Sequence, residues 1–396
     1  MEQIIKSVLD TDTYTFTVGQ LAFMQYYGLN VKYKFFNRKG TKFPEGFSEM
    51  LKNQLLAMED LCFTREDSFV LARKIPALKD AYFDSLIGYK PFKRWREDLT
   101  ISQDGGDLSI DIEGWWRESV FWEVPLLALI SELYYKMTDS RPTSEIEVSA
   151  ESKFYEKSDT LEALNFFSEF GTRRRYSFAN QDSLLKFMIY ENVRGLAGTS
   201  NVFLANKHRI EAIGTMSHQV YQAHQALYGV RSANFEAMKA WLREFNGKLS
   251  IMLPDTYGTD MFLHIFNGYY ARLCDGIRQD SGSPFEIGRG IIHHYETLGI
   301  DPKTKKIIFS DGLTPKIAYD LQKYFEGRIK VAFGIGTNLS NDVGVAPLSI
   351  VIKAVSFGGV PVVKLSDSVG KYTGKKEDID HALYEVHQTL DGDRRF

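Results

Sequence analysis

The sequence contains little that would mark a secreted, disulfide-stapled or nucleic-acid-binding protein. Only two cysteines, Cys62 and Cys274, occur in 396 residues, which excludes a disulfide framework and a thiolate metal cluster and favours a reducing compartment. The 48 basic and 51 acidic residues leave a net charge of −3. Bulk charge therefore gives no reason to expect a nucleic acid or a membrane surface as a partner.

Long apolar runs are absent as well. The most apolar segment, 120–135, is interrupted by Glu123, Pro125 and Glu132, which argues against a membrane-spanning helix. The N-terminus, MEQIIKSVLDTDTY, reaches polar and acidic residues before the apolar region of a secretory signal can form. We therefore expect a cytoplasmic protein.

Several familiar catalytic motifs are also missing. The sequence has no G-x-x-x-x-G-K-[ST] loop, no G-x-G-x-x-G that opens a helix, no G-x-S-x-G and no C-x-x-C. These absences disfavour a P-loop ATPase, a dinucleotide enzyme and a serine hydrolase.

Residues 1–140 are predicted to form an α+β domain. Residues 31–36 (VKYKFF) alternate between apolar and polar side chains, as a half-buried strand does. Residues 99–112 (LTISQDGGDLSIDI) indicate a hairpin that turns at Asp104-Gly-Gly.

From 141 to 374 the pattern changes to short apolar runs, each followed by a helical stretch. The clearest unit is 306–327, where a strand (IIFS) precedes an N-cap at Thr314, Pro315 at the first helical position, and a closing Gly327. The next strand (IKVAF) starts within two residues of that glycine, so the connection must be a parallel crossover.

Similar runs predict about eight strands in this region, the number that a closed β/α barrel needs. We place the strand candidates at 166–170, 201–204, 212–215, 249–253, 275–278, 307–310, 329–333 and 361–365. The fold class is therefore an α/β barrel of the TIM type behind an N-terminal α+β domain, with an open doubly wound sheet as the alternative. A tail, 375–396, is left over and could pack back on the N-terminal domain.

Barrel enzymes carry their chemistry where the strands end, and the residues at these ends form a consistent set. Arginines in EFGTRRR, including Arg173, and the turn Gly334-Ile-Gly336-Thr337 suit phosphate, because guanidinium groups and bare backbone N–H groups both bind it. Asp280 and Asp311 suit ribose hydroxyls or Mg²⁺. His218 could act as a general base, a phosphate donor or a phosphoryl acceptor.

The ordered series EFGTRRR, GTSN, GTMSHQ, IRQDSG, FSDGL, FGIGTN and KLSDSVGK, with Thr11-Asp-Thr-Tyr14 near the N-terminus, resembles the nicotinate phosphoribosyltransferase family from residue 11 to about 374. The resemblance implies an irregular β/α barrel and a dimer with shared active sites. It implies transfer of a phosphoribosyl group from 5-phosphoribosyl 1-pyrophosphate to nicotinate in NAD salvage. It also implies Mg²⁺ as cofactor and ATP as co-substrate, with hydrolysis coupled through a phosphorylated histidine.

The resemblance also implies roles for single residues. Phe170 would stack on the pyridine ring, with Tyr14 of the neighbouring subunit on its other face, and Arg278 would meet the nicotinate carboxylate. His218 would be phosphorylated. The remaining implied roles concern the ribose and the phosphates: Arg173 on the phosphate side, Asp280 and Asp311 at the ribose hydroxyls, and Gly336 and Thr337 at the 5-phosphate. Gly334 and Lys364 are further candidates for substrate binding.

Ser200 bears on the choice between nicotinate and nicotinamide. It stands where nicotinamide phosphoribosyltransferases resemble GTD, and an acid there would repel a carboxylate, so serine favours nicotinate. The alternatives are a nicotinamide phosphoribosyltransferase and a sugar-phosphate aldolase with Lys364 as Schiff-base amine. A non-catalytic phosphate sensor and a quinolinate phosphoribosyltransferase agree less well with the motif series.

Overall fold

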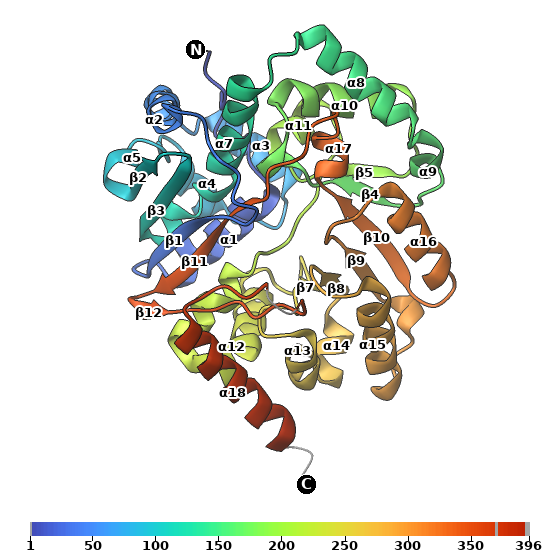
Figure 1. The fold of residues 1–396 in the computed structure, drawn as a ribbon. Coiled ribbons are helices and arrows are strands. Elements are labelled where there is room, and N and C mark those ends of the chain that lie inside the picture. Colours follow the sequence, from blue (N-terminus) through green and yellow to red (C-terminus); the bar gives the residue numbers. More distant parts are fainter. Residues whose placement is uncertain (1, 369–370, 393–396) are drawn as a thin grey trace.

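The computed structural model describes residues 2–368 and 371–392 and contains two separate β-sheets, one antiparallel and one parallel (Figure 1). In the antiparallel sheet the strand order is β12-β11-β1-β3-β2. The bounds of its strands are β1 Asn30–Asn37, β2 Leu99–Asp104, β3 Asp107–Trp115, β11 Ile350–Phe357 and β12 Val360–Pro361. The strand predicted at 31–36 and the hairpin predicted at 99–112 are confirmed, the latter as the β2–β3 pair.

The seven-stranded second sheet is parallel throughout and curls into an incomplete barrel (Figure 1). Its strand order is β6-β5-β4-β10-β9-β8-β7. The bounds are β4 Phe167–Glu169, β5 Leu196–Thr199, β6 Glu211–Ala212, β7 Ile251–Met252, β8 Gly276–Gln279, β9 Lys306–Phe309 and β10 Lys330–Ile335. The predicted irregular β/α barrel is confirmed.

Two strand candidates are wrong in detail. Residues 201–204 begin a helix, because the Asn201 side chain accepts a hydrogen bond from the Leu204 backbone N–H and so caps it; the strand lies earlier, at β5. Residues 361–365 do not join the parallel sheet, since Pro361 pairs with β11 and Lys364 makes an isolated bridge to Thr373. Within the described residues the parallel sheet therefore has seven strands instead of eight.

The crossover predicted between β9 and β10 is confirmed. The helix α16 (Pro315–Phe325) begins after Thr314, whose hydroxyl accepts a hydrogen bond from the Ile317 N–H at 3.2 Å. Gly327 takes a positive φ of 72°, which glycine adopts without a steric penalty. The chain then enters β10, which pairs in parallel with β9.

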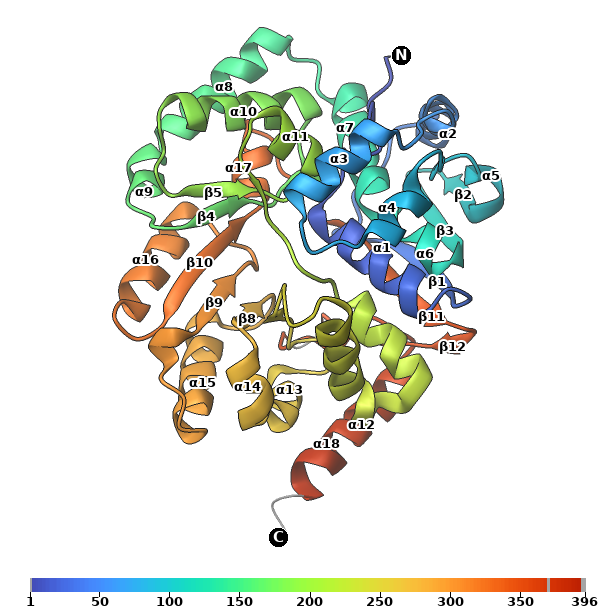
Figure 2. The same ribbon diagram turned by 180° about the vertical axis from the view of Figure 1, so that it is seen from behind.

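Helices cover both sheets (Figures 1 and 2). The N-terminal helices are α1 Thr13–Gln25, α2 Phe47–Met58, α3 Arg65–Lys74, α4 Asp80–Leu86, α5 Trp95–Asp98, α6 Trp116–Ser119 and α7 Glu123–Thr138. The later α-helices are α8 Thr143–Tyr155, α9 Ser158–Glu162, α10 Phe178–Tyr190, α11 Val202–Lys207, α12 Gln219–Glu244, α13 Thr259–Ile265, α14 Gly268–Leu273, α15 Pro284–Thr297, α16, α17 Thr337–Ser340 and α18 Lys376–Gly392. Short 3₁₀ turns span Thr172–Arg174 and Pro302–Thr304.

The two sheets draw on both halves of the chain. Strand β11 lies between β1 and β12, so a late segment completes the N-terminal sheet.

The division of the chain into domains at residues 140 and 374 stays a prediction. Within the tail, helix α18 packs against α12 and α13, whereas the sequence left open packing on the N-terminal domain; residues 393–396 lie outside the described residues. Across residues 2–368 and 371–392, no helix combines the length and apolarity needed to cross a membrane.

Candidate active site

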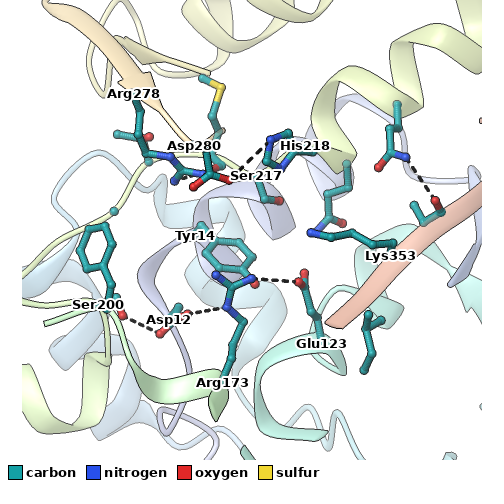
Figure 3. Close-up of a pocket in the computed structure, with 18 of the residues that line it drawn as sticks. Asp12, Tyr14, Glu123, Arg173, Ser200, Ser217, His218, Arg278, Asp280 and Lys353 are labelled. Carbon is teal, nitrogen blue, oxygen red and sulfur yellow. Dashed lines mark hydrogen bonds and ion pairs between the residues drawn. The ribbon is translucent and has the colours of Figure 1, made fainter. Parts of the chain in front are cut away.

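A pocket lies where the C-terminal ends of the parallel strands face α1 and β11 (Figure 3). Its walls come from both sheets and from the chain that follows β6. The lining residues are Asp12, Tyr14, Tyr33, Glu123, Phe170, Arg173, Ser200, residues 213–219, Gln222, Arg278, Asp280 and residues 352–354. The pocket thus brings together seven of the predicted site residues: Tyr14, Phe170, Arg173, Ser200, His218, Arg278 and Asp280.

Tyr14 reaches this pocket from its own chain, whereas the resemblance implied that the neighbouring subunit supplies it. The segment before α1 explains how. The Thr13 N–H donates to the Ser200 carbonyl at 2.8 Å, and the Val202 N–H donates to the Thr11 carbonyl at 3.0 Å. These bonds lay the start of the chain along the end of β5.

The other predicted residues are not among the lining residues of this pocket in the described chain; they are Asp311, Gly334, Gly336, Thr337 and Lys364. A Cβ on Gly334 would come within 2.4 Å of the Phe170 ring, and one on Gly336 within 3.3 Å of the Phe170 carbonyl. Both glycines therefore leave room for Phe170. Thr337 begins the short helix α17, and Asp311 follows β9 with Lys371 at 3.5 Å.

The three consecutive arginines occupy three different environments. Arg173 lines the pocket, 3.4 Å from Glu123 and 3.9 Å from Asp12. Arg174 has no acid within ion-pair distance in the described residues; burial, with repulsion from Arg173 and Arg38, lowers the pKa of Arg174 to about 10. Arg175 turns away and is fully buried. Only the first two arginines can therefore attract a polyanion.

His218 stands at the centre of a buried hydrogen-bonded group. Its Nε2 lies 2.9 Å from a carboxylate oxygen of Asp255, whose other oxygen accepts from Lys364 Nζ at 2.8 Å and from the Ser281 hydroxyl at 2.7 Å. Burial opposes ionisation of Asp255, yet His218 and Lys364 hold the pKa of this carboxyl well below its usual range.

The charges around His218 determine which of its nitrogens is free. Burial, reinforced by Lys364, lowers the pKa of His218 to about 4, so the imidazole is neutral near pH 7. An ionised Asp255 can only accept, so Nε2 carries the proton and Nδ1 keeps its lone pair. No hydrogen bond to Nδ1 occurs within the described part of the chain. The arrangement therefore leaves Nδ1 as a free nucleophile.

Three pocket residues carry buried polar atoms without a hydrogen-bond partner in the described structure. They are the Tyr14 hydroxyl, the Ser217 hydroxyl and the Nε of Arg278. The Arg278 guanidinium otherwise contacts the Met216 carbonyl at 3.3 Å and Asp280 at 3.7 Å. Because buried polar groups are nearly always paired, these atoms indicate a polar ligand in the pocket.

Several potential metal-ligating groups lie close together in or beside the pocket. Ligand atoms of His218, Asp255 and Asp280 lie within 4.8 Å of one another. Asp255 is already occupied by three donors, which makes it a poor metal ligand. Asp280 and Asp311 end neighbouring strands, and burial raises the pKa of Asp311. Hard oxygen ligands of this kind suit Mg²⁺.

Sequence reasoning missed two charged residues of the pocket, Glu123 and Lys353 (Figure 3). Glu123 starts α7, and Lys353 lies on β11, a strand that was not predicted although IVIKAVSF is rich in β-branched residues. Burial lowers the pKa of Lys353 to about 8. Asp12 lies within the Thr11-Asp-Thr-Tyr14 motif, and Asp255 follows the strand candidate at 249–253, but neither was given a role.

Comparisons with known proteins agree with this geometry. The N-terminal domain model of the nicotinate phosphoribosyltransferase (NAPRTase) family matches residues 9–131, and the NAPRTase family model matches residues 166–391. A nicotinate phosphoribosyltransferase of Desulforapulum autotrophicum is 40% identical over 387 residues, covering 96% of this chain and 98% of that protein.

Solved structures of the same family superpose closely. The nicotinate phosphoribosyltransferase of Porphyromonas gingivalis has a TM-score of 0.90 at 39% identity and covers 97% of this chain and 100% of its own. The enzyme of Vibrio cholerae has a TM-score of 0.89 at 32% identity, covering 99% of this chain and 97% of its own. The chain therefore belongs to the nicotinate phosphoribosyltransferase family of enzymes.

Proposed function

We propose that this protein transfers a phosphoribosyl group from 5-phosphoribosyl 1-pyrophosphate to nicotinate and releases pyrophosphate. The observation that carries this proposal is the unpartnered Nε of Arg278, buried in the same pocket as the rings of Phe170 and Tyr14. A flat ring with one carboxylate would fill the space near the two aromatic side chains and satisfy the guanidinium.

The cationic side of the pocket supports a polyanionic second substrate. Arg173 and Lys353 line the pocket, and Arg38 and Arg174 lie close enough to repel Arg173 electrostatically. Departure of pyrophosphate places negative charge on the leaving group and positive character on the ribose. Cations would stabilise the first, and Asp280 would stabilise the second. The pyridine nitrogen attacks, so no side-chain nucleophile is required for transfer.

Mg²⁺ fits this site as a proposed cofactor. Asp280 and Asp311 would hold it together with substrate oxygens, and it would neutralise the developing pyrophosphate charge. Ser310 donates a 2.9 Å hydrogen bond to Asp280 and would fix that carboxylate's orientation.

ATP coupling is proposed through Nδ1 of His218. This lone pair would attack the γ-phosphorus of ATP, the bond to the bridging oxygen would break, and ADP would leave. Asp255 would stabilise the phosphorylated imidazole through Nε2–H, and hydrolysis would later return His218 and phosphate. Assembly as a homodimer, a cytoplasmic location and a place in NAD salvage complete the proposal.

The alternatives receive less support. A Schiff-base lysine must be unprotonated, whereas the Lys364 ammonium is ion-paired with Asp255 and lies outside the pocket lining. Nicotinamide remains the competing acceptor, and Ser200 bears on that choice.

The decisive test measures pyrophosphate release from 5-phosphoribosyl 1-pyrophosphate and Mg²⁺ with nicotinate or nicotinamide, each with and without ATP. Release with nicotinate that increases with ATP is expected. Release with nicotinamide instead would overturn the assigned acceptor, and no release with either would overturn the reaction.

A further inference from the structure

A buried ion pair joins Asp10 and Arg175, each of which is two residues along the chain from a residue that lines the pocket. The guanidinium of Arg175 donates to both carboxylate oxygens of Asp10, at 2.7 and 2.8 Å, and the side chains are 0% and 2% exposed. Neither residue lines the pocket. A buried ion pair contributes little net stability compared with apolar packing, because both charges lose their hydration. Stability alone therefore does not explain why this ion pair is buried here.

Asp10 fixes the register of the segment that leads into α1. Besides Arg175, its carboxylate accepts from the Asn201 side-chain amide at 2.8 Å. The Phe203 N–H donates to the Leu9 carbonyl at 3.0 Å, which holds the segment on its other flank. Asp10 and Asp12 are two residues apart in a tight turn, in which the Asp10 N–H donates to the Ser7 carbonyl at 3.2 Å and the Thr11 N–H to the Leu9 carbonyl at 2.8 Å, so anchoring Asp10 also restricts where Asp12 lies.

Asp12 carries this register into the pocket. Its carboxylate accepts from the Ser200 hydroxyl at 2.7 Å and lies 3.9 Å from Arg173. A displacement of this segment relative to residues 200–203 would separate Asp12 from both partners.

Arg175 anchors the 3₁₀ turn Thr172–Arg174, which carries Arg173 and ends directly before it. Its carbonyl accepts from the Ser131 hydroxyl at 2.7 Å, and its guanidinium lies 3.8 Å from Glu132 and 3.3 Å from the Gln181 side-chain oxygen. Gln181 in turn donates to Glu169, the last residue of β4. The end of the turn is thus tied to α7, α10 and the barrel sheet.

We propose that Asp10 and Arg175 are positioning residues for phosphoribosyl transfer. Their paired hydrogen bonds set the spacing between the segment that brings Asp12 and Tyr14 and the turn that brings Arg173. The expected loss of transfer rate rests on the proposed function. The expected loosening of the two segments rests on the contacts alone.

A matched control separates positioning from plain stabilisation. Glu244 is also buried, 3% exposed, and pairs with Lys79 at 2.8 Å while accepting from Gln20 and Gln25 at 2.9 Å. It does not line the pocket. Glu244→Gln therefore removes a buried carboxylate whose partners, Lys79, Gln20 and Gln25, do not line the pocket.

The first arm of the experiment is kinetic. Asp10→Asn, Arg175→Lys and Glu244→Gln are compared with the wild type well below each melting temperature, so that all the protein is folded. Displacing reactive groups by about 1 Å costs about 10²-fold in rate, so Asp10→Asn and Arg175→Lys should lose about that much in kcat for pyrophosphate release. Glu244→Gln should keep the wild-type kcat. Equal kcat values in all three variants would overturn the proposal.

The second arm does not depend on activity. Amide hydrogen exchange of Thr13, Val202 and Phe203, whose N–H groups bind the two segments together, should accelerate at least tenfold in Asp10→Asn and Arg175→Lys but not in Glu244→Gln. Uniform acceleration across the chain, or the same pattern in Glu244→Gln, would overturn the proposal.

The two arms also separate the two proposals. An inactive wild type would refute the proposed function, and the exchange arm would then decide the positioning role by itself. Should Asp10→Asn not fold, Arg175→Lys, which keeps the buried charge but loses the two-pronged geometry, decides both arms.

Discussion

Inside the pocket, the Ser200 hydroxyl donates a 2.7 Å hydrogen bond to the carboxylate of Asp12. Burial raises the pKa of Asp12, and the nearby Arg173 opposes that rise. Ser200 therefore does more than avoid a negative charge, because its hydroxyl also holds an existing carboxylate in place. A substitution here changes two groups at once.

Ser200→Asp should shift the preference away from nicotinate. The new carboxylate would stand beside Asp12 and add repulsion toward a carboxylate substrate, so kcat/KM for nicotinate should fall at least about 10-fold more than kcat/KM for nicotinamide. Steady-state kinetics with both acceptors measure this ratio. Ser200→Ala, which adds no charge, is the control and should keep the ratio; an unchanged ratio in Ser200→Asp would disprove the selectivity role.

His218→Ala should abolish the stimulation of transfer by ATP and leave a residual ATP-independent rate. The imidazole is the proposed phosphoryl acceptor, whereas the attack on ribose needs no side-chain nucleophile. Initial rates with and without ATP measure the effect. His208→Ala is a suitable control, because His208 bonds to Asp182 at 2.8 Å and does not line the pocket. Full coupling in His218→Ala would refute the assignment.

Gly334→Ala should weaken the binding of nicotinate by disturbing Phe170. The added Cβ would lie 2.4 Å from the ring, far inside contact distance, so the ring must move. Overpacking of this kind costs about 1–3 kcal/mol, which corresponds to a rise in the KM for nicotinate of about 5- to 150-fold. Gly290→Ala meets open space on α15 and should change nothing. A normal KM in Gly334→Ala would count against a stacking role of Phe170.

Stability should decline between pH 6.5 and pH 4. Burial lowers the pKa of both His218 and His224 to about 4, compared with 6.5 in an unfolded chain. Between these pH values the two histidines bind protons in the unfolded state but stay neutral in the folded state. Acidification therefore lowers the free energy of unfolding, by up to about 3 kcal/mol for each histidine.

Urea unfolding at a series of pH values measures this slope. His224→Gln, which removes one of the two groups, should make the decline shallower. The same decline in His224→Gln and the wild type would contradict the assignment of His224 as a buried neutral base.

Much of the fold follows from local signals. The β9–α16–β10 unit was predictable because a cap at Thr314, a proline at the first helical position and Gly327 each act within a few residues. The segment 201–204 was misassigned because VFL is a typical strand sequence, while the cap supplied by Asn201 favours a helix.

The site was partly predictable for a related reason. Residues that end parallel strands must gather at one edge, which places Phe170, Arg173, Ser200, Arg278 and Asp280 together. Lys353 and Glu123 come from outside the parallel strands, so no strand-end argument could have found them.

By itself, the sequence determined the element types, the alternation of strands and helices that is typical of a barrel, and the motif series that marks the family. Capping, periodicity and turn chemistry, on which these depend, are local. Only the tertiary structure decided that β11 completes the N-terminal sheet, that Asp255 and Lys364 leave Nδ1 of His218 free, and that Arg175 turns from the pocket to Asp10. These relationships join residues far apart along the chain, and burial sets their charges; neither distance nor burial is encoded in the local pattern.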